Sequence, residues 1–229
     1  MNKGNIIILT VVLAALLGYL VYSQTRPDPL ESIATNQAAP TEENQFTTSP
    51  SPENEPTQSS TRPEIAMPIS QAEQRITKKS YGTYVTPQNS PVSPEVFTGY
   101  HTGADFEVFD TEANTDVDVN AICDGELLRK TTATGYGGYA LQSCNIEGKA
   151  VTVVYGHMRL SSISAKVGNT LTAGEKIGVL GTGYSNETSN ERKHLHLSIH
   201  VGTSVDIRGY VQGKAALSAW MDPKVVLGL

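Results

Sequence analysis

Residues 194 to 200 constrain the fold of this chain more than any other stretch. Leu195, Leu197 and Ile199 alternate there with three histidines and a serine. Such alternation is typical of a β-strand, because successive side chains point to opposite faces of a sheet. One face of this strand should therefore meet an apolar core. The other face carries imidazoles, which points to a functional site, although a histidine-rich strand exposed to solvent is the alternative.

Two of these histidines are placed to share one ligand. His194 and His196 lie two residues apart on the same face, so both can point into one pocket. Neutral imidazole is the commonest protein ligand for transition metals. His200 shares the face but lies roughly 13 Å beyond His196 on an extended strand, so we expect it outside the coordination sphere.

His101 and Asp105 form a second pair of candidate metal-binding residues. On a straight strand these residues would be roughly 13 Å apart, so the chain must bend if both bind one ion, and Gly103 permits a bend. Histidine and aspartate both suit zinc, and one histidine from His194 and His196 would complete three protein ligands, leaving a fourth position for water. That arrangement is typical of catalytic zinc. Taken alone, the His-x-x-x-Asp spacing also fits a capped turn with an exposed histidine.

His157 follows Gly156 at the end of an apolar run that we interpret as a buried strand. A histidine just past a strand end lies where functional sites are often built, although an exposed loop histidine is the alternative.

The second half of the chain consists of short apolar runs separated by turn residues, with almost no helical periodicity. This texture predicts an all-β domain with an antiparallel sandwich or barrel-like core. The predicted strands are residues 84–85, 106–109, 117–119, 126–128, 139–141, 151–155, 176–180 and 194–201. Residues 214–220 favour a helical turn, and a short helix is predicted around residues 70–78.

The N-terminal part has a different composition. Residues 6–22 are apolar or small apart from one threonine, with Lys3 before them and no basic residue after them until Arg26. Because the positive end stays in the cytoplasm, we expect the rest of the chain to be exported. We interpret residues 1–23 as an N-terminal transmembrane anchor, with a cleaved signal peptide as the alternative, which would make the protein secreted.

Residues 24–74 are rich in Pro, Ser, Thr and Glu and hold two basic residues against eight acidic ones. Such a segment cannot bury enough apolar surface to offset its ordering entropy, so we predict a disordered linker. Residues 75–229 hold 14 basic and 15 acidic residues and form the predicted folded domain. No basic face of the kind used by nucleic-acid-binding proteins is evident, so we expect no nucleic-acid partner.

Export would permit a disulfide, and Cys123 and Cys144 are the two cysteines of the chain. We favour a bridge between them, with two separate buried thiols as the alternative. Their spacing lacks the short cysteine pair of a cysteine-ligated zinc site.

Taken together, the histidine motifs resemble those of the LytM/lysostaphin-type zinc metallopeptidases, peptidase family M23. The resemblance covers about residues 80–229. Its motifs are His-x-x-x-Asp, Tyr-x-His and His-x-His, matched here by His101/Asp105, Tyr155/His157 and His194/His196.

The resemblance implies a β-sheet core of the M23 (duplicated hybrid motif) type and one Zn²⁺ held by His101, Asp105 and His196. His157 and His194 would then assist catalysis beside the metal without binding it. The implied activity is hydrolysis of peptide bonds in cross-links or stem peptides of peptidoglycan. Which histidine is the general base, which bond is cut and the oligomeric state stay open.

Two alternatives to wall hydrolysis remain. One is a non-enzymatic wall-binding scaffold or activator of other hydrolases, and the other is a peptidase for proteins or peptide toxins. The loop 182–193 and the stretch 205–220 are longer than the resemblance implies, which leaves substrate choice open.

Overall fold

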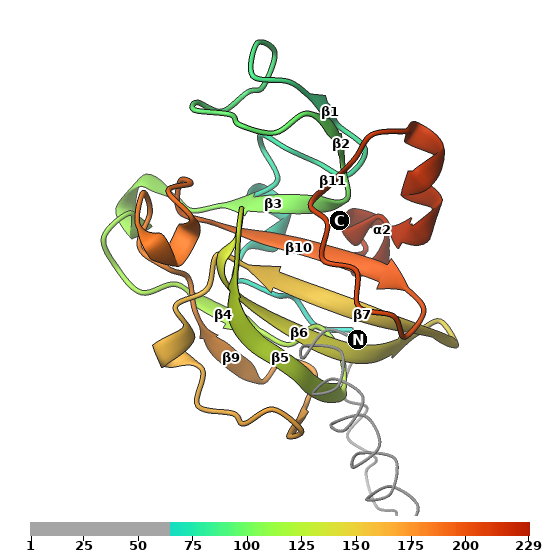
Figure 1. Ribbon diagram of the computed structural model, residues 1–229. Helices are drawn as coiled ribbons and strands as arrows, with labels where there is room; N and C mark the ends of the chain where they lie inside the picture. The colour runs from blue at the N-terminus through green and yellow to red at the C-terminus, as the bar shows by residue number, and fades with distance from the viewer. Residues whose placement is uncertain (1–64) are drawn as a thin grey trace, which may run out of the picture. The chain divides into compact units, whose positions relative to one another are not determined.

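The computed structural model describes residues 65–229, which form a β domain with few helices (Figure 1). Its main sheet has the strand order β12-β10-β7-β6-β5-β8, and β3 pairs with β10 beside this path. All of these pairs are antiparallel. The strands are β3 (Gly103–Glu107), β5 (Gly125–Ala133), β6 (Gly137–Ile146), β7 (Lys149–Gly156), β8 (Thr170–Leu171), β10 (His194–Val201) and β12 (Trp220–Met221).

Two smaller sheets flank the main one. The first contains β1 (Tyr84–Val85), β2 (Gly99–His101) and β11 (Tyr210–Val211), and the second pairs β4 (Asp118–Asn120) with β9 (Lys176–Val179). The largest apolar core contains inward side chains of the main sheet, such as Phe106 and Leu197, together with Val119 and Ile177 from the β4/β9 pair. The prediction of an antiparallel all-β domain is confirmed.

The described helices are short. The 3₁₀ helices span Ala72–Gln74, Asp110–Glu112, Leu160–Ser162, Asn186–Thr188 and Lys214–Ala219, and the α-helix α2 spans Pro223–Leu227. The helical turn predicted at residues 214–220 is therefore present, whereas the helix predicted around residues 70–78 is a single 3₁₀ turn. Asp222 caps α2 by accepting a hydrogen bond from the backbone N–H of Lys224.

Each predicted strand overlaps a strand of the structure, but the lengths differ. The strand predicted at 106–109 ends at Glu107, and β5 and β6 are much longer than their predicted apolar runs. A tight two-residue turn joins β6 to β7, so the two strands stay paired up to Ile146 and Lys149. Glu147 and Gly148 both have positive φ, 53° and 75°, as the two central residues of a type I′ turn require.

The packed structure begins before residue 75. Ile69 and Ala72 are buried in the main core, and the backbone N–H of Ala66 donates to the carbonyl of Ile122 over 2.8 Å. Residues 65–74, which the sequence analysis assigned to the linker, thus form an arm packed on the domain. The predicted anchor and residues 24–64 of the predicted linker lie outside the described residues.

Cys123 and Cys144 form the predicted disulfide, with their Cα atoms 6.0 Å apart. The bridge joins the segment before β5 to the far part of β6, and both cysteines belong to the main core. Within residues 65–229, no helix is long and apolar enough to cross a membrane.

Candidate metal centre

The centre of the site is set by the register of strand β10. Antiparallel pairing places Asp105 of β3 directly opposite His196 on one side and Gly156 of β7 opposite it on the other. Side chains of directly opposed residues are close enough to interact. The missing side chain at Gly156 leaves room, since a Cβ there would lie 2.5 Å from Cδ1 of Tyr136 and 3.2 Å from Cβ of His196.

His101 reaches the same point because the chain changes sheets between β2 and β3. Strand β2 pairs with β1 and β11, whereas β3 pairs with β10. Gly103 follows the crossing, and a Cβ at this position would meet the carbonyl oxygen of Leu197 and lie 2.9 Å from Nε2 of His196. The bend predicted between His101 and Asp105 is present, and it requires a residue without a side chain.

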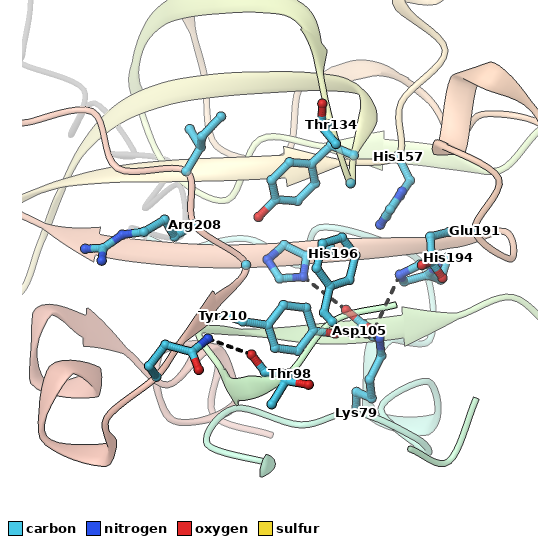
Figure 2. Close-up of a pocket in the computed structure, with 16 residues that line it drawn as sticks. Lys79, Thr98, Asp105, Thr134, His157, Glu191, His194, His196, Arg208 and Tyr210 are labelled. Carbon is cyan, nitrogen blue, oxygen red and sulfur yellow. Dashed lines mark hydrogen bonds and ion pairs between the residues drawn. The ribbon is translucent and has the colours of Figure 1, made fainter. Parts of the chain in front are cut away.

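As a result, one possible ligand atom each from His101, Asp105 and His196 lies close to the other two. Figure 2 shows Asp105 beside His196. His101 Nε2 lies 3.0 Å from His196 Nδ1 and 3.3 Å from Asp105 Oδ1, and His196 Nδ1 lies 3.1 Å from the same Oδ1. A tetrahedral zinc ion with bonds of about 2.0–2.1 Å separates its ligands by about 3.3 Å. The three residues therefore fit one zinc ion in donor type and in spacing, and they form a possible metal site.

The protonation of the histidines also suits metal binding. His101 Nδ1 lies 3.3 Å from the carbonyl oxygen of Ser80, so its N–H can donate there and leave the lone pair of Nε2 for a metal. Burial lowers the pKa of His196 to about 4, so its imidazole is neutral at pH 7. Burial also raises the pKa of Asp105, but the imidazoles of His194 and His101 outweigh this effect and hold that pKa well below its usual range.

His157 and His194 lie next to each other beside this group. Their ring centroids are 4.1 Å apart, and both side chains are almost fully buried. His194 Nδ1 lies 2.9 Å from the carbonyl oxygen of Arg192, and its Nε2 lies 3.4 Å from Asp105 Oδ2. His157 has a left-handed backbone, with φ 62°, directly after the end of β7, and burial lowers its pKa well below the usual value.

The model of one family, described as peptidase family M23, matches residues 99–207, a range that contains all five histidines and Asp105. Residues 99–207 belong to peptidase family M23. The resemblance predicted from the sequence is confirmed.

Among solved structures, this chain is similar to LytU, with 22% identity and a TM-score of 0.45 over 66% of this chain and 83% of that chain. It is also similar to a zinc-containing peptidase from Vibrio cholerae, with 22% identity and a TM-score of 0.40 over 61% of this chain and 37% of that chain. A third similar structure is described as a SpoIIIAH and SpoIIQ complex, with 21% identity and a TM-score of 0.44 over 69% of this chain and 96% of that chain. No curated protein matches the chain.

The fifth histidine of the chain, His200, lies apart from the three candidate metal ligands. Its ring meets Trp220 edge to face with centroids 5.1 Å apart, and its Nε2 lies 4.0 Å from Asp206 Oδ2. It is absent from the group of three ligands, as expected from its position on the strand.

A pocket of about 380 Å³ opens onto the site (Figure 2). Its aromatic walls are Phe97, Tyr136 and Tyr210, and Phe97 stacks on Tyr210 with centroids 5.3 Å apart. The hydroxyl of Tyr136 is buried and has no hydrogen-bond partner among the described residues. These aromatic residues were not predicted to line a site, because nothing in their local spacing distinguishes them from core residues.

Charged residues complete the lining of the pocket. Lys79 Nζ donates to the hydroxyl of Tyr210 over 2.7 Å and lies 3.6 Å from Asp105 Oδ2. Glu191 also faces the pocket, and burial raises its pKa. The loop 182–193, whose length leaves substrate choice open, thus contributes a carboxylate to the pocket wall.

Proposed function

We propose that this protein is a zinc metalloendopeptidase that hydrolyses peptide bonds in peptidoglycan cross-links or stem peptides. The observation that carries this proposal is the convergence of His101, Asp105 and His196 on one point, with His157 and His194 at its edge. Membership in a peptidase family supports the same activity.

The three ligands would hold one Zn²⁺ through His101 Nε2, His196 Nδ1 and Asp105 Oδ1. Zinc in such a site supplies Lewis acidity and activates water for attack at neutral pH. The chain provides two neutral imidazoles and one carboxylate, leaving a net positive charge at the metal that favours this chemistry.

We assign proton transfer to His194. Its Nδ1 proton is committed to the carbonyl of Arg192, which leaves the lone pair of Nε2 free to accept a proton and later to pass it to the leaving amine. His157 lies beside it with no side-chain hydrogen bond to hold it elsewhere among the described residues. Its N–H is available to hydrogen-bond the oxygen on which negative charge develops.

The pocket supports binding of an extended peptide. The unpartnered hydroxyl of Tyr136 can donate a hydrogen bond to a substrate carbonyl, and the aromatic rings of Phe97 and Tyr210 offer apolar surface. Lys79 and Glu191 add one charge of each sign, which suits a peptide that carries both amino and carboxylate groups.

We further propose that the domain works outside the cytoplasm, tethered by the N-terminal anchor and linker. The Cys123–Cys144 disulfide supports this location, because such bridges persist in oxidising compartments. The main alternative is a non-enzymatic scaffold. Scaffold members of such families lack metal ligands, so the complete set of converging ligands favours the enzyme.

The test is incubation of the full-length purified protein with peptidoglycan, with and without a chelator. We expect new amino termini that disappear on chelation and return when zinc is restored. Absence of new termini at every zinc concentration, on substrates from thin and thick walls alike, would contradict the hydrolase and favour the scaffold.

A further inference from the structure

Arg192 is buried between two carboxylates, one of which is the proposed metal ligand Asp105. Its side chain is 9% exposed. The Nη2 group donates to Asp105 Oδ2 over 2.8 Å and to Glu107 Oε1 over 2.5 Å. The Nε group donates to both oxygens of Glu107, over 3.1 and 2.9 Å. One guanidinium therefore bridges Asp105 and Glu107.

The bridge follows from the register of β3 and β10. Asp105 and Glu107 lie two residues apart on β3, so both side chains point to the same face, and Glu107 pairs with His194 across the sheet. Arg192 lies two residues before the start of β10, and its guanidinium contacts both of these carboxylates. Glu107 thus fixes the position from which Arg192 reaches Asp105.

The two oxygens of Asp105 consequently have different surroundings. Oδ1 faces His101 Nε2 and His196 Nδ1 at 3.3 and 3.1 Å. Oδ2 faces Arg192 at 2.8 Å, His194 Nε2 at 3.4 Å and Lys79 Nζ at 3.6 Å. A charge-assisted hydrogen bond to a guanidinium is strong enough to keep Oδ2 turned away from the ligand group.

We propose that Arg192 is a positioning residue that restricts Asp105 to one-oxygen coordination of the metal. Because Arg192 holds Oδ2, Asp105 offers only Oδ1 to the metal. One coordination position of the metal is then left for water or substrate. This inference rests on the metal site of the proposed function and adds a residue outside the ligand set.

The planar shape of the guanidinium is essential to this role. Its nitrogens lie in a fixed fork, so it can bind Glu107 and Asp105 at the same time, whereas a lysine ammonium is a point charge on a flexible stem. Lys79, which already lies near Oδ2, is held by Glu95 at 3.2 Å and by the hydroxyl of Tyr210. It therefore cannot replace the second anchor that Glu107 gives to Arg192.

The decisive variant is Arg192→Lys, which keeps the positive charge and removes the fork. We expect Asp105 to bind the metal through both oxygens in this variant, raising the coordination number. The Co²⁺-substituted protein should then show weaker visible absorption, as Co²⁺ does when it passes from four to five ligands. Zinc affinity should fall by about 10- to 100-fold, the usual effect of losing a residue that orients a metal ligand.

Arg159→Lys is the matched control, because Arg159 also bridges two carboxylates, Asp116 at 2.8 Å and Glu187 at 3.5 Å. We expect it to leave the Co²⁺ spectrum and the zinc dissociation constant unchanged. An Arg192→Lys variant whose spectrum and zinc affinity both match the wild type would overturn the proposal. A wild-type protein that binds no Co²⁺ would instead overturn the metal site and the proposed function with it.

Glu107→Gln covers the case in which Arg192→Lys does not fold. It leaves the Arg192–Asp105 contact possible but removes the charge that anchors the guanidinium. We expect a smaller change in the same direction for the Co²⁺ absorption and the zinc affinity, and an unchanged spectrum in a folded Glu107→Gln protein would count against the positioning role.

Discussion

At the scale of single residues, His194 and His196 lie two positions apart on β10 and have different contacts. His196 Nδ1 faces His101 Nε2 and Asp105 Oδ1 within 3.1 Å, whereas His194 is held by the Arg192 carbonyl and lies beside His157. The register of one strand against β3 therefore separates the proposed ligand from the proposed proton carrier.

This separation predicts different losses in alanine variants. His196→Ala should lose bound zinc, because two ligands alone hold it weakly. His157→Ala and His194→Ala should keep zinc and lose about 100- to 10,000-fold in hydrolysis, the range for general acid–base groups. Metal content after gel filtration, measured beside peptide release, checks this. Full zinc occupancy in His196→Ala would contradict the ligand assignment.

Gly103 is the second critical residue, since an added Cβ would press on the Leu197 carbonyl oxygen and on the His196 ring. Gly103→Ala should cost about 1–3 kcal/mol in the free energy of unfolding, as overpacked sites do, and should weaken zinc binding. Urea unfolding and zinc titration measure both. Gly213→Ala is the control, because nothing lies within 4 Å of a Cβ there. Equal stability of the two variants would mean that the β2–β3 bend tolerates a side chain.

At the scale of elements, the disulfide ties the segment before β5 to β6 across a sequence separation of 21 residues. A loop of this length corresponds to about 3 kcal/mol of chain entropy in the unfolded state. The double variant Cys123→Ala/Cys144→Ala should lose about that much stability in urea unfolding while keeping its bound zinc, because neither cysteine lies among the metal ligands. The wild type under reducing conditions should lose a similar amount. Loss of zinc in the folded double variant would show that the bridge also shapes the site.

At the scale of the whole molecule, several carboxylates are stabilised in the charged form. Hydrogen bonds from Arg75 hold the pKa of Glu112 below its usual value. Burial raises the pKa of Glu95, but the backbone N–H of Phe97 and the nearby Lys79 outweigh it and leave the pKa lowered. A lowered folded-state pKa contributes stability at neutral pH that is lost as the pH falls through that pKa.

The metal-free protein should therefore lose unfolding free energy as the pH falls below about 5, where these carboxylates become protonated. Urea unfolding at pH 7, 5, 4 and 3 measures this loss. Glu112→Gln should be less stable at pH 7 and should show a shallower decline, since the group no longer titrates. A wild-type stability that stays constant from pH 5 to pH 3 would contradict the assignment of these carboxylates.

The arm formed by residues 65–74 packs on the domain, although its polar composition predicted a disordered linker. Polar composition placed these residues in the linker, yet Ile69 and Ala72 are buried and the Ser70 carbonyl accepts a hydrogen bond from Arg75 Nε over 2.6 Å. A few apolar side chains are enough to dock a segment when the domain already offers a matching surface, and the local sequence does not contain that surface.

The sequence by itself located eight of the strands, favoured the disulfide and identified the candidate ligands His101, Asp105 and His196. Strand periodicity and the identity of metal-binding side chains are local properties, and the family motif relates the distant pieces to one another. Only the tertiary structure decided how Arg192, Glu107, Lys79 and Tyr136 surround those ligands. Arg192 and Glu107 are 85 residues apart, so their contact depends on the register between β3 and β10, which no local pattern encodes.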